Sequence, residues 1–206
     1  IVSLIKILER TDPKSLTGAL IGIPVANVSA YEARQYVSPV DGVNLSGGFP
    51  GDPRGSITQR VAHTLATEVI PRANYVVDLH GGGWATLEVM PMAIHRLTGN
   101  QKIDEGQEEL SRAFLCKYAE CVQERPAGQR SVAGQGHTLG IPGITVECGR
   151  QGIVKDSCVN FNLKGAHNLM RHLGMIEGQP EKLSQQKPFY PYPPLRPNRA
   201  GLSFPK

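Results

Sequence analysis

Two segments of the sequence place side chains that can do chemistry directly after short apolar runs. The first is DLH at residues 78–80, and the second is TVE at residues 145–147. Neutral imidazole is a common zinc ligand, and a carboxylate can take a proton from zinc-bound water. His80 and Glu147 could therefore act together on one metal or one substrate bond. A histidine at a strand end is more often structural, and a glutamate before glycine is commonly a solvated cap, so spacing alone leaves both interpretations open.

His80 also begins the segment HGGGW at residues 80–84, which is typical of the oxyanion loop of some lipases and esterases. That chemistry needs a downstream nucleophile elbow, G-x-S-x-G. The flanking glycines are missing at Ser111, Ser131 and Ser157. A serine esterase of the HGGG type therefore stays a minor alternative. Cys148 beside Glu147 could act as a nucleophile, but no sequence feature supplies a partner for it.

The remaining cysteines and histidines show no recognisable ligand spacing. The four cysteines form no paired C-x-x-C motif. We expect Cys116 and Cys121 to be small buried apolar residues on a helix, and His63 to be structural.

The pattern of apolar residues predicts which elements position these side chains. Helical spacing predicts helices from residue 1 to about 12, and over 56–70, 103–123 and 157–173. Short apolar runs predict buried strands over 19–25, 75–80, 87–94 and 141–146. Residues 38–56 are dense in Gly, Pro, Asp and Ser and predict a long irregular loop. The alternation predicts an α/β fold with a mixed, largely parallel sheet flanked by helices, in which ligands bind beyond the carboxyl ends of the strands.

The composition narrows the class of protein. The 206 residues are 40% hydrophobic and 19% charged, which predicts one folded domain and excludes a disordered chain. No run approaches 18 apolar residues, so we expect no membrane partner. The net charge is only +4, with Lys and Arg scattered, so we expect no nucleic-acid partner either. No signal-peptide pattern is present, and a cytoplasmic location is expected. Nothing indicates the oligomeric state.

Three ordered blocks resemble a known family. They are DGVNL, FPGDP and GS-T-R-AH between residues 41 and 63, VDLHGGG at 77–83, and GIPGITVECG at 140–149. Together they resemble the succinylglutamate desuccinylase/aspartoacylase family, a branch of the zinc carboxypeptidase-like hydrolases. Within it, the chain is most similar to N-acetyl-diaminobutyrate deacetylases. The resemblance implies a carboxypeptidase-like α/β core over residues 1–175 and a zinc enzyme that hydrolyses the amide of a small N-acyl amino acid.

The resemblance also implies roles for individual residues. His80 matches a zinc ligand of the family, and the carboxylate of Asp78 would orient the His80 imidazole. Glu147 matches the general base, which takes a proton from zinc-bound water and passes it to the leaving nitrogen. Asn44 and Ser46 lie where the family binds substrate.

The sequence departs from the family in three places. The family's H-x-x-E zinc pair is absent from the chain and is expected to precede Ile1. Ser46 and Gly47 stand where the family has an Asn-Arg pair that supports the carbonyl and the substrate carboxylate. Arg54, Arg60 or Arg130 could compensate. Residues 176–206 are Pro-rich and predict a linker to a C-terminal β-domain.

These departures produce two expectations. A catalytic zinc site needs three protein ligands, so we expect the 206-residue chain by itself to be inactive, while the parent protein is a zinc-dependent deacylase. The alternative is a non-catalytic relative that acts as a binding or scaffold protein, which Ser46 and Gly47 favour.

Overall fold

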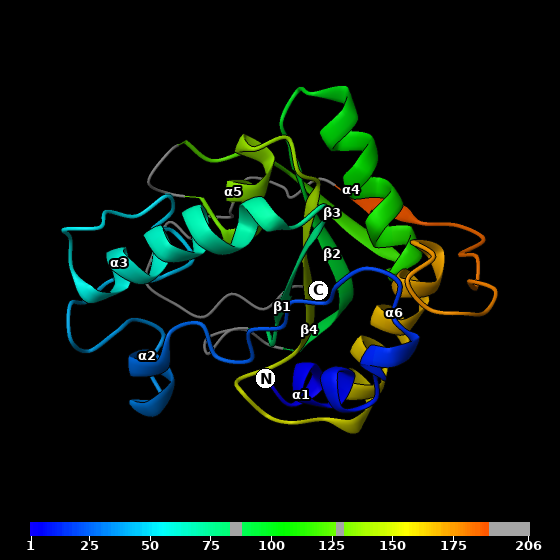
Figure 1. Ribbon diagram of the computed structural model, residues 1–206, viewed down its shortest axis with the longest axis horizontal. Coiled ribbons are helices and arrows are strands. Elements are labelled where there is room, and N and C mark those ends of the chain that lie inside the picture. Colours follow the sequence, from blue (N-terminus) through cyan, green and yellow to red (C-terminus); the bar gives the residue numbers. More distant parts are fainter. Residues whose placement is uncertain (83–87, 127–129, 190–206) are drawn as a thin grey trace, which may run out of the picture.

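A mixed five-stranded sheet forms the centre of the molecule (Figure 1). The computed structural model describes residues 1–82, 88–126 and 130–189. The sheet order is β1-β4-β2-β3-β5, and β2 and β4 are antiparallel while the other pairs are parallel. The strands are β1 (Val76–His80), β2 (Val89–Leu97), β3 (Tyr118–Gln123), β4 (Gly143–Gly149) and β5 (Lys187–Phe189). The prediction of a mixed, largely parallel sheet flanked by helices is confirmed.

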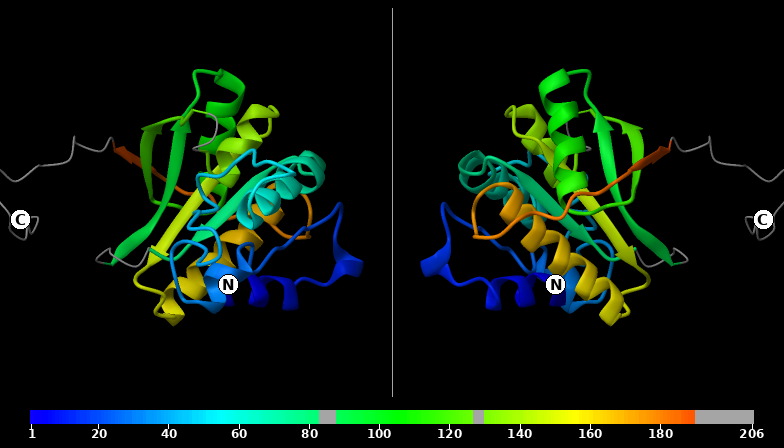
Figure 2. Two further views of the ribbon diagram at one scale, coloured as in Figure 1. Left: turned by 90° about the vertical axis from the view of Figure 1, so that its left-hand side faces the viewer. Right: turned by 90° about the vertical axis from the view of Figure 1, so that its right-hand side faces the viewer.

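Six α-helices accompany the sheet in the described residues. They are α1 (Val2–Glu9), α2 (Val28–Glu32), α3 (Ile57–Thr64), α4 (Gln101–Ala113), α5 (Val132–Thr138) and α6 (Asp156–His172). α3 continues through a π-helical turn at Leu65–Val69 and a 3-10 turn at Ile70–Arg72. Figure 2 shows α1, in dark blue, beside α6, in gold, and these two helices pack together. The predicted helices at 1–12, 56–70 and 157–173 are therefore confirmed to within a few residues.

Each face of the sheet carries its own apolar core. On one face, Ile144 and Val146 of β4 pack with Leu110 and Phe114 near the end of α4 and with Leu169 of α6. On the other face, α3 and the turns after it pack against Val76 of β1 and Val132 of α5. Alternate residues of a strand point to opposite faces, so Thr145 and Glu147 lie on the face opposite Ile144 and Val146.

The predicted strand over 19–25 is wrong. These residues run as an extended segment that joins no sheet of the described chain, and Ile21 is 51% exposed. An apolar run becomes a strand only when a neighbouring strand completes its hydrogen bonds, and none of the described residues does so here.

The predicted helix over 103–123 is also partly wrong. α4 ends at Ala113, and Leu115 has a positive φ of 64°, which turns the chain out of the helix. Residues Tyr118–Gln123 then form β3, which pairs in parallel with β2. Cys121 lies on this strand and Cys116 lies between α4 and β3, so neither is on a helix. Both Cys116 and Cys121 are buried, as expected.

The loop over residues 38–56 is irregular, as predicted, and Asp41 holds it to the start of α3. The Asp41 carboxylate accepts hydrogen bonds from Ser56 Oγ at 2.6 Å and from the backbone N–H of Thr58 at 2.8 Å. These bonds, the one from Ser56 above all, hold the pKa of Asp41 well below its usual range. The loop is therefore tied to the helix that packs against β1.

The chain after α6 returns to the far edge of the sheet. Gln186 is buried and donates a hydrogen bond to the carbonyl oxygen of Cys116 at 2.8 Å, just before β5 begins. None of the described helices has the length and apolarity needed to cross a membrane.

Candidate active site

His80 and Glu147 meet at the adjacent ends of β1 and β4. They are register partners in the parallel pair, which places their side chains on the same face of the sheet. Nδ1 of His80 lies 3.1 Å from Oε1 of Glu147. The imidazole is 35% exposed and the carboxylate 16% exposed, so solvent reaches the pair from one side.

Asp78 completes a row of three polar groups. It lies two residues before His80 on β1, hence on the same face, and its Oδ2 is 3.1 Å from His80 Nε2. Burial opposes the charged form of His80, but the attraction of Asp78 and the hydrogen bonds to Asp78 and Glu147 outweigh it and raise the pKa of His80 to about 11. Without a metal, the imidazole is therefore protonated at neutral pH and donates to both carboxylates.

The second oxygen of Glu147 is held by the backbone. The N–H of Gly82 donates to Glu147 Oε2 at 3.0 Å. Gly82 has a φ of +74°, and a Cβ at this position would overlap the carbonyl oxygen of Gly149. A glycine is therefore required for the turn that aims this N–H at the carboxylate.

The two predicted substrate-binding residues, Asn44 and Ser46, lie in the loop before α3. Asn44 Oδ1 accepts a hydrogen bond from the N–H of Ser46 at 3.0 Å. In the part of the chain that the structure describes, neither residue bonds to His80 or Glu147. Gly83 and Trp84 of the HGGGW segment fall outside the described residues.

Two further histidines with buried side chains, His95 and His137, make structural contacts away from this pair. His95 Nε2 lies 2.7 Å from Ser111 Oγ. His137 is held at both ring nitrogens, by Glu124 Oε2 at 2.6 Å and by the carbonyl oxygen of Gly143 at 2.9 Å. Neither histidine is a candidate ligand in this arrangement.

Cys148 is no candidate nucleophile in this structure. Burial raises the pKa of the Cys148 thiol to about 12, and a hydrogen bond with Cys158 adds to the effect. The reactive form of cysteine is the thiolate, so a thiol with this pKa is inert at neutral pH.

Sequence reasoning missed three groups on this face of the sheet. The Gly82 N–H is one, and the glycines after His80 are its only sequence signal. Met92 of β2 is the register partner of Glu147 and lies beside it. Arg96, four residues along the same strand face, is only 8% exposed, and its Nε has no hydrogen-bond partner among the described residues. An arginine inside the apolar run MAIHRL was the available signal for this buried charge.

The donor atoms at this site fit zinc in type but not in number. A histidine whose other ring nitrogen is held by a carboxylate is a common zinc ligand, and His80 with Asp78 has this arrangement. However, residues 1–82, 88–126 and 130–189 hold no group of three His, Cys, Asp or Glu side chains able to bind a metal ion. The described residues can therefore supply one imidazole ligand and a fixed carboxylate base beside it.

Comparison with known proteins supports the family resemblance. A family model described as the succinylglutamate desuccinylase/aspartoacylase catalytic domain matches residues 1–173. The N-alpha-acetyl-L-2,4-diaminobutyric acid deacetylase of Halomonas elongata is 30% identical over 182 residues, which are 87% of this chain and 52% of that protein. The chain thus spans about half the length of this curated relative.

Two solved structures share the fold. The product-bound ectoine utilization protein EutE (DoeB) from Ruegeria pomeroyi is 28% identical with a TM-score of 0.82, covering 92% of this chain and 57% of that one. A succinylglutamate desuccinylase/aspartoacylase from Rhodobacter sphaeroides is 25% identical, with the same TM-score and coverage.

Proposed function

The chain belongs to the succinylglutamate desuccinylase/aspartoacylase family, and from this we propose that it forms part of a zinc-dependent hydrolase that cleaves the amide of an N-acyl amino acid. The observation that supports the proposal best is the contact between His80 and Glu147 at adjacent strand ends. The name of the Halomonas relative makes N-acetylated diaminobutyric acid the first substrate to test.

Glu147 is the general base of this proposal. The Gly82 N–H holds its Oε2 and fixes the direction of the carboxylate, and this contact does not depend on His80 Nδ1, which would bind zinc. From this position it takes a proton from the attacking water and delivers it to the leaving nitrogen when the amide bond breaks. A positioned base of this kind typically contributes roughly 10²–10⁴-fold to the rate.

His80 is the one zinc ligand that the described residues supply. Its Nδ1, which faces Glu147, would bind the ion, and Asp78 would hold Nε2–H and so fix the tautomer. Zinc, when bound, polarises the carbonyl and lowers the pKa of water. We further propose that Asn44 and Ser46 contact the substrate, although Ser46 and Gly47 cannot reproduce the clamp that an arginine gives a carboxylate.

One imidazole is too few for a catalytic zinc site, which uses three protein ligands. Residues 1–206 alone should therefore hold zinc weakly and turn over no substrate. The test is zinc quantification by mass spectrometry after dialysis, together with an amine-release assay on N-acetyl-diaminobutyric acid and related N-acyl amino acids. Stoichiometric zinc with turnover in residues 1–206 would contradict this part of the proposal.

A non-catalytic binding or scaffold protein is the second candidate, because Ser46 and Gly47 remove the family's arginine. The same assay on the natural protein separates the two. Zinc with turnover supports the hydrolase, whereas binding of N-acyl amino acids without turnover supports the second candidate. The serine esterase has no support in the comparisons.

A further inference from the structure

Two cysteines lie in contact on the far side of the sheet from Glu147. Cys148 follows Glu147 on β4, so its side chain points to the opposite face, on which Val146 packs against α6. Cys158 is in the first turn of α6, and its Sγ lies 3.4 Å from the position that a Cβ would take at Gly149. The thiols of Cys148 and Cys158 share a hydrogen bond. The sheet and the helix therefore hold two thiols together, directly behind the proposed base.

The two thiols differ in their access to solvent. Of the four cysteines, Cys158 is the one that is not buried. Cys148 is buried and its thiol has a pKa of about 12, so it does not react by itself with an oxidant in solution. Cys116 and Cys121 are buried as well. An oxidant that enters from solvent therefore meets Cys158 first.

From this arrangement we infer that Cys148 and Cys158 are a modification site, at which a reversible disulfide forms and lowers the activity of the enzyme. Formation of the bond depends on the two cysteines alone, whereas its effect on turnover rests on the proposed function. The four cysteines are free thiols in this structure, so it shows the reduced state.

A peroxide is the class of oxidant that completes the reaction. The sulfur of Cys158 attacks one oxygen of hydrogen peroxide, the O–O bond breaks, and the released hydroxide takes up the thiol proton as water. Cys158 is then a sulfenic acid. The sulfur of Cys148 attacks the sulfur of Cys158, the S–O bond breaks, and the hydroxyl group leaves as water with the proton of Cys148. Two thiols and one peroxide thus give one disulfide and two molecules of water.

The contact with Cys158 compensates for the high pKa of Cys148 in the second step. A group held beside its target reacts as if at very high concentration, with effective molarities of roughly 10⁵–10⁸ M in well-oriented pairs. Burial is the main cause of the high pKa of Cys148, and the hydrogen bond and the charge of Cys158 raise it further. The sulfenic acid is neutral, so oxidation of Cys158 removes the effect of that charge.

The disulfide would act on Glu147 through two glycines. An S–S bond is about 2.05 Å long, shorter than any contact between two thiols, so Cys148 and the adjoining backbone of Gly149 must shift when it forms. The carbonyl oxygen of Gly149 lies so close to Gly82 that a Cβ on Gly82 would overlap it. The N–H of Gly82 holds Glu147 Oε2, so a shift of Gly149 disturbs the direction of the carboxylate. A misplacement of about 1 Å at an active site can cost roughly 100-fold in rate.

Peptide mapping of the natural protein after treatment with hydrogen peroxide tests whether the bond forms. Trypsin places these four cysteines in different peptides, because a lysine or arginine lies between each neighbouring pair. After alkylation of the remaining thiols, mass spectrometry should find peptides 131–150 and 156–164 joined, and a phosphine reductant should separate them. Cys158→Ser should abolish the joined pair, whereas Cys121→Ser, at a buried position of β3, should keep it.

Three results of the mapping would overturn the inference. They are a bond from Cys148 to Cys116, a bond between two molecules on a non-reducing gel, and oxidation of Cys158 without any bond. Four thiols that all remain free at a peroxide concentration that oxidises exposed methionines would overturn it too.

Assays of the same samples test the effect on turnover. The kcat/KM for N-acetyl-diaminobutyric acid should fall roughly 10–100-fold as the joined pair accumulates, and the phosphine should restore it. Cys158→Ser should stay active under the same treatment, whereas Cys121→Ser should lose activity as the wild type does. Full activity with the disulfide formed would overturn the effect on turnover. An inactive protein before oxidation would contradict the proposed function and this effect with it, while the peptide map still decides whether the disulfide forms.

Discussion

The imidazole of His80 lies between two carboxylates, with Nδ1 3.1 Å from Glu147 Oε1 and Nε2 3.1 Å from Asp78 Oδ2. Strand pairing sets this geometry, because His80 and Glu147 are register partners and Asp78 shares the strand face of His80. Each carboxylate thus fixes one nitrogen of the ring.

Asp78→Asn should weaken zinc binding without removing the ligand. The amide keeps a hydrogen-bonding group beside Nε2 but loses the charge that holds the imidazole in one tautomer. Loss of such a partner typically costs roughly 10–100-fold in metal affinity. Competition with a chromophoric chelator, performed on the natural protein, measures the change. Asp156→Asn, at an exposed position of α6, is the control, and equal affinities in all three proteins would show that Asp78 does not act through His80.

Gly82→Ala should disturb the site through the backbone. The new Cβ would overlap the carbonyl oxygen of Gly149, so the N–H that holds Glu147 Oε2 must move. Gly99→Ala is the matched control, because Gly99 has a similar φ of +77° but open space around its Cβ position. Both variants should lose thermal stability from the unfavourable φ, but only Gly82→Ala should lower kcat in the natural protein. Equal effects on kcat would contradict the assignment.

His95 should make the fold less stable in mild acid. Burial lowers the pKa of His95 to about 4, against about 6.5 in an unfolded chain, so the unfolded state takes up the proton first. Stability is therefore complete above pH 6.5, falls as the pH drops toward 4, and changes no further below that from this group. The full effect is roughly 3 kcal/mol.

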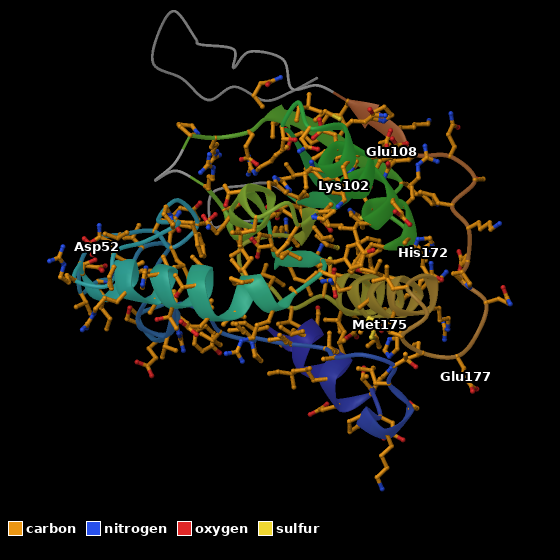
Figure 3. The ribbon with its side chains drawn as sticks, turned by 45° about the horizontal axis from the view of Figure 1, so that its top comes forward. Asp52, Lys102, Glu108, His172, Met175 and Glu177 are labelled. Carbon is orange, nitrogen blue, oxygen red and sulfur yellow. The ribbon has the colours of Figure 1, made fainter. Side chains whose placement is uncertain are left out.

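Urea unfolding from pH 8 to pH 4.5 measures this dependence. His95→Gln keeps a polar group near Ser111 but cannot titrate, so its free energy of unfolding should fall less steeply over this range. His172→Ala serves as control, because His172 lies at the molecular surface in contact with Glu109 (Figure 3). Parallel pH curves for wild type and His95→Gln would show that His95 does not titrate in this way.

The strand ends that carry His80 and Glu147 could be predicted because each strand is a short apolar run followed by polar residues and glycine. β3 could not, since YAECVQ continues the helical pattern of α4 and becomes a strand only by pairing with β2. The opposite error at residues 19–25 has the same cause, because strand formation depends on a neighbour that local sequence does not reveal. The Gly82 contact was missed because a backbone N–H leaves no side-chain signature.

Glu147→Gln in the natural protein distinguishes a catalytic base from a structural carboxylate beside the proposed zinc ligand His80. We expect kcat/KM for N-acetyl-diaminobutyric acid to fall by roughly 10²–10⁴-fold with zinc content unchanged, because glutamine cannot accept the proton. Glu177→Gln is the control, as Glu177 lies exposed on the segment after α6 (Figure 3). Wild-type turnover in Glu147→Gln would show that Glu147 is not the base.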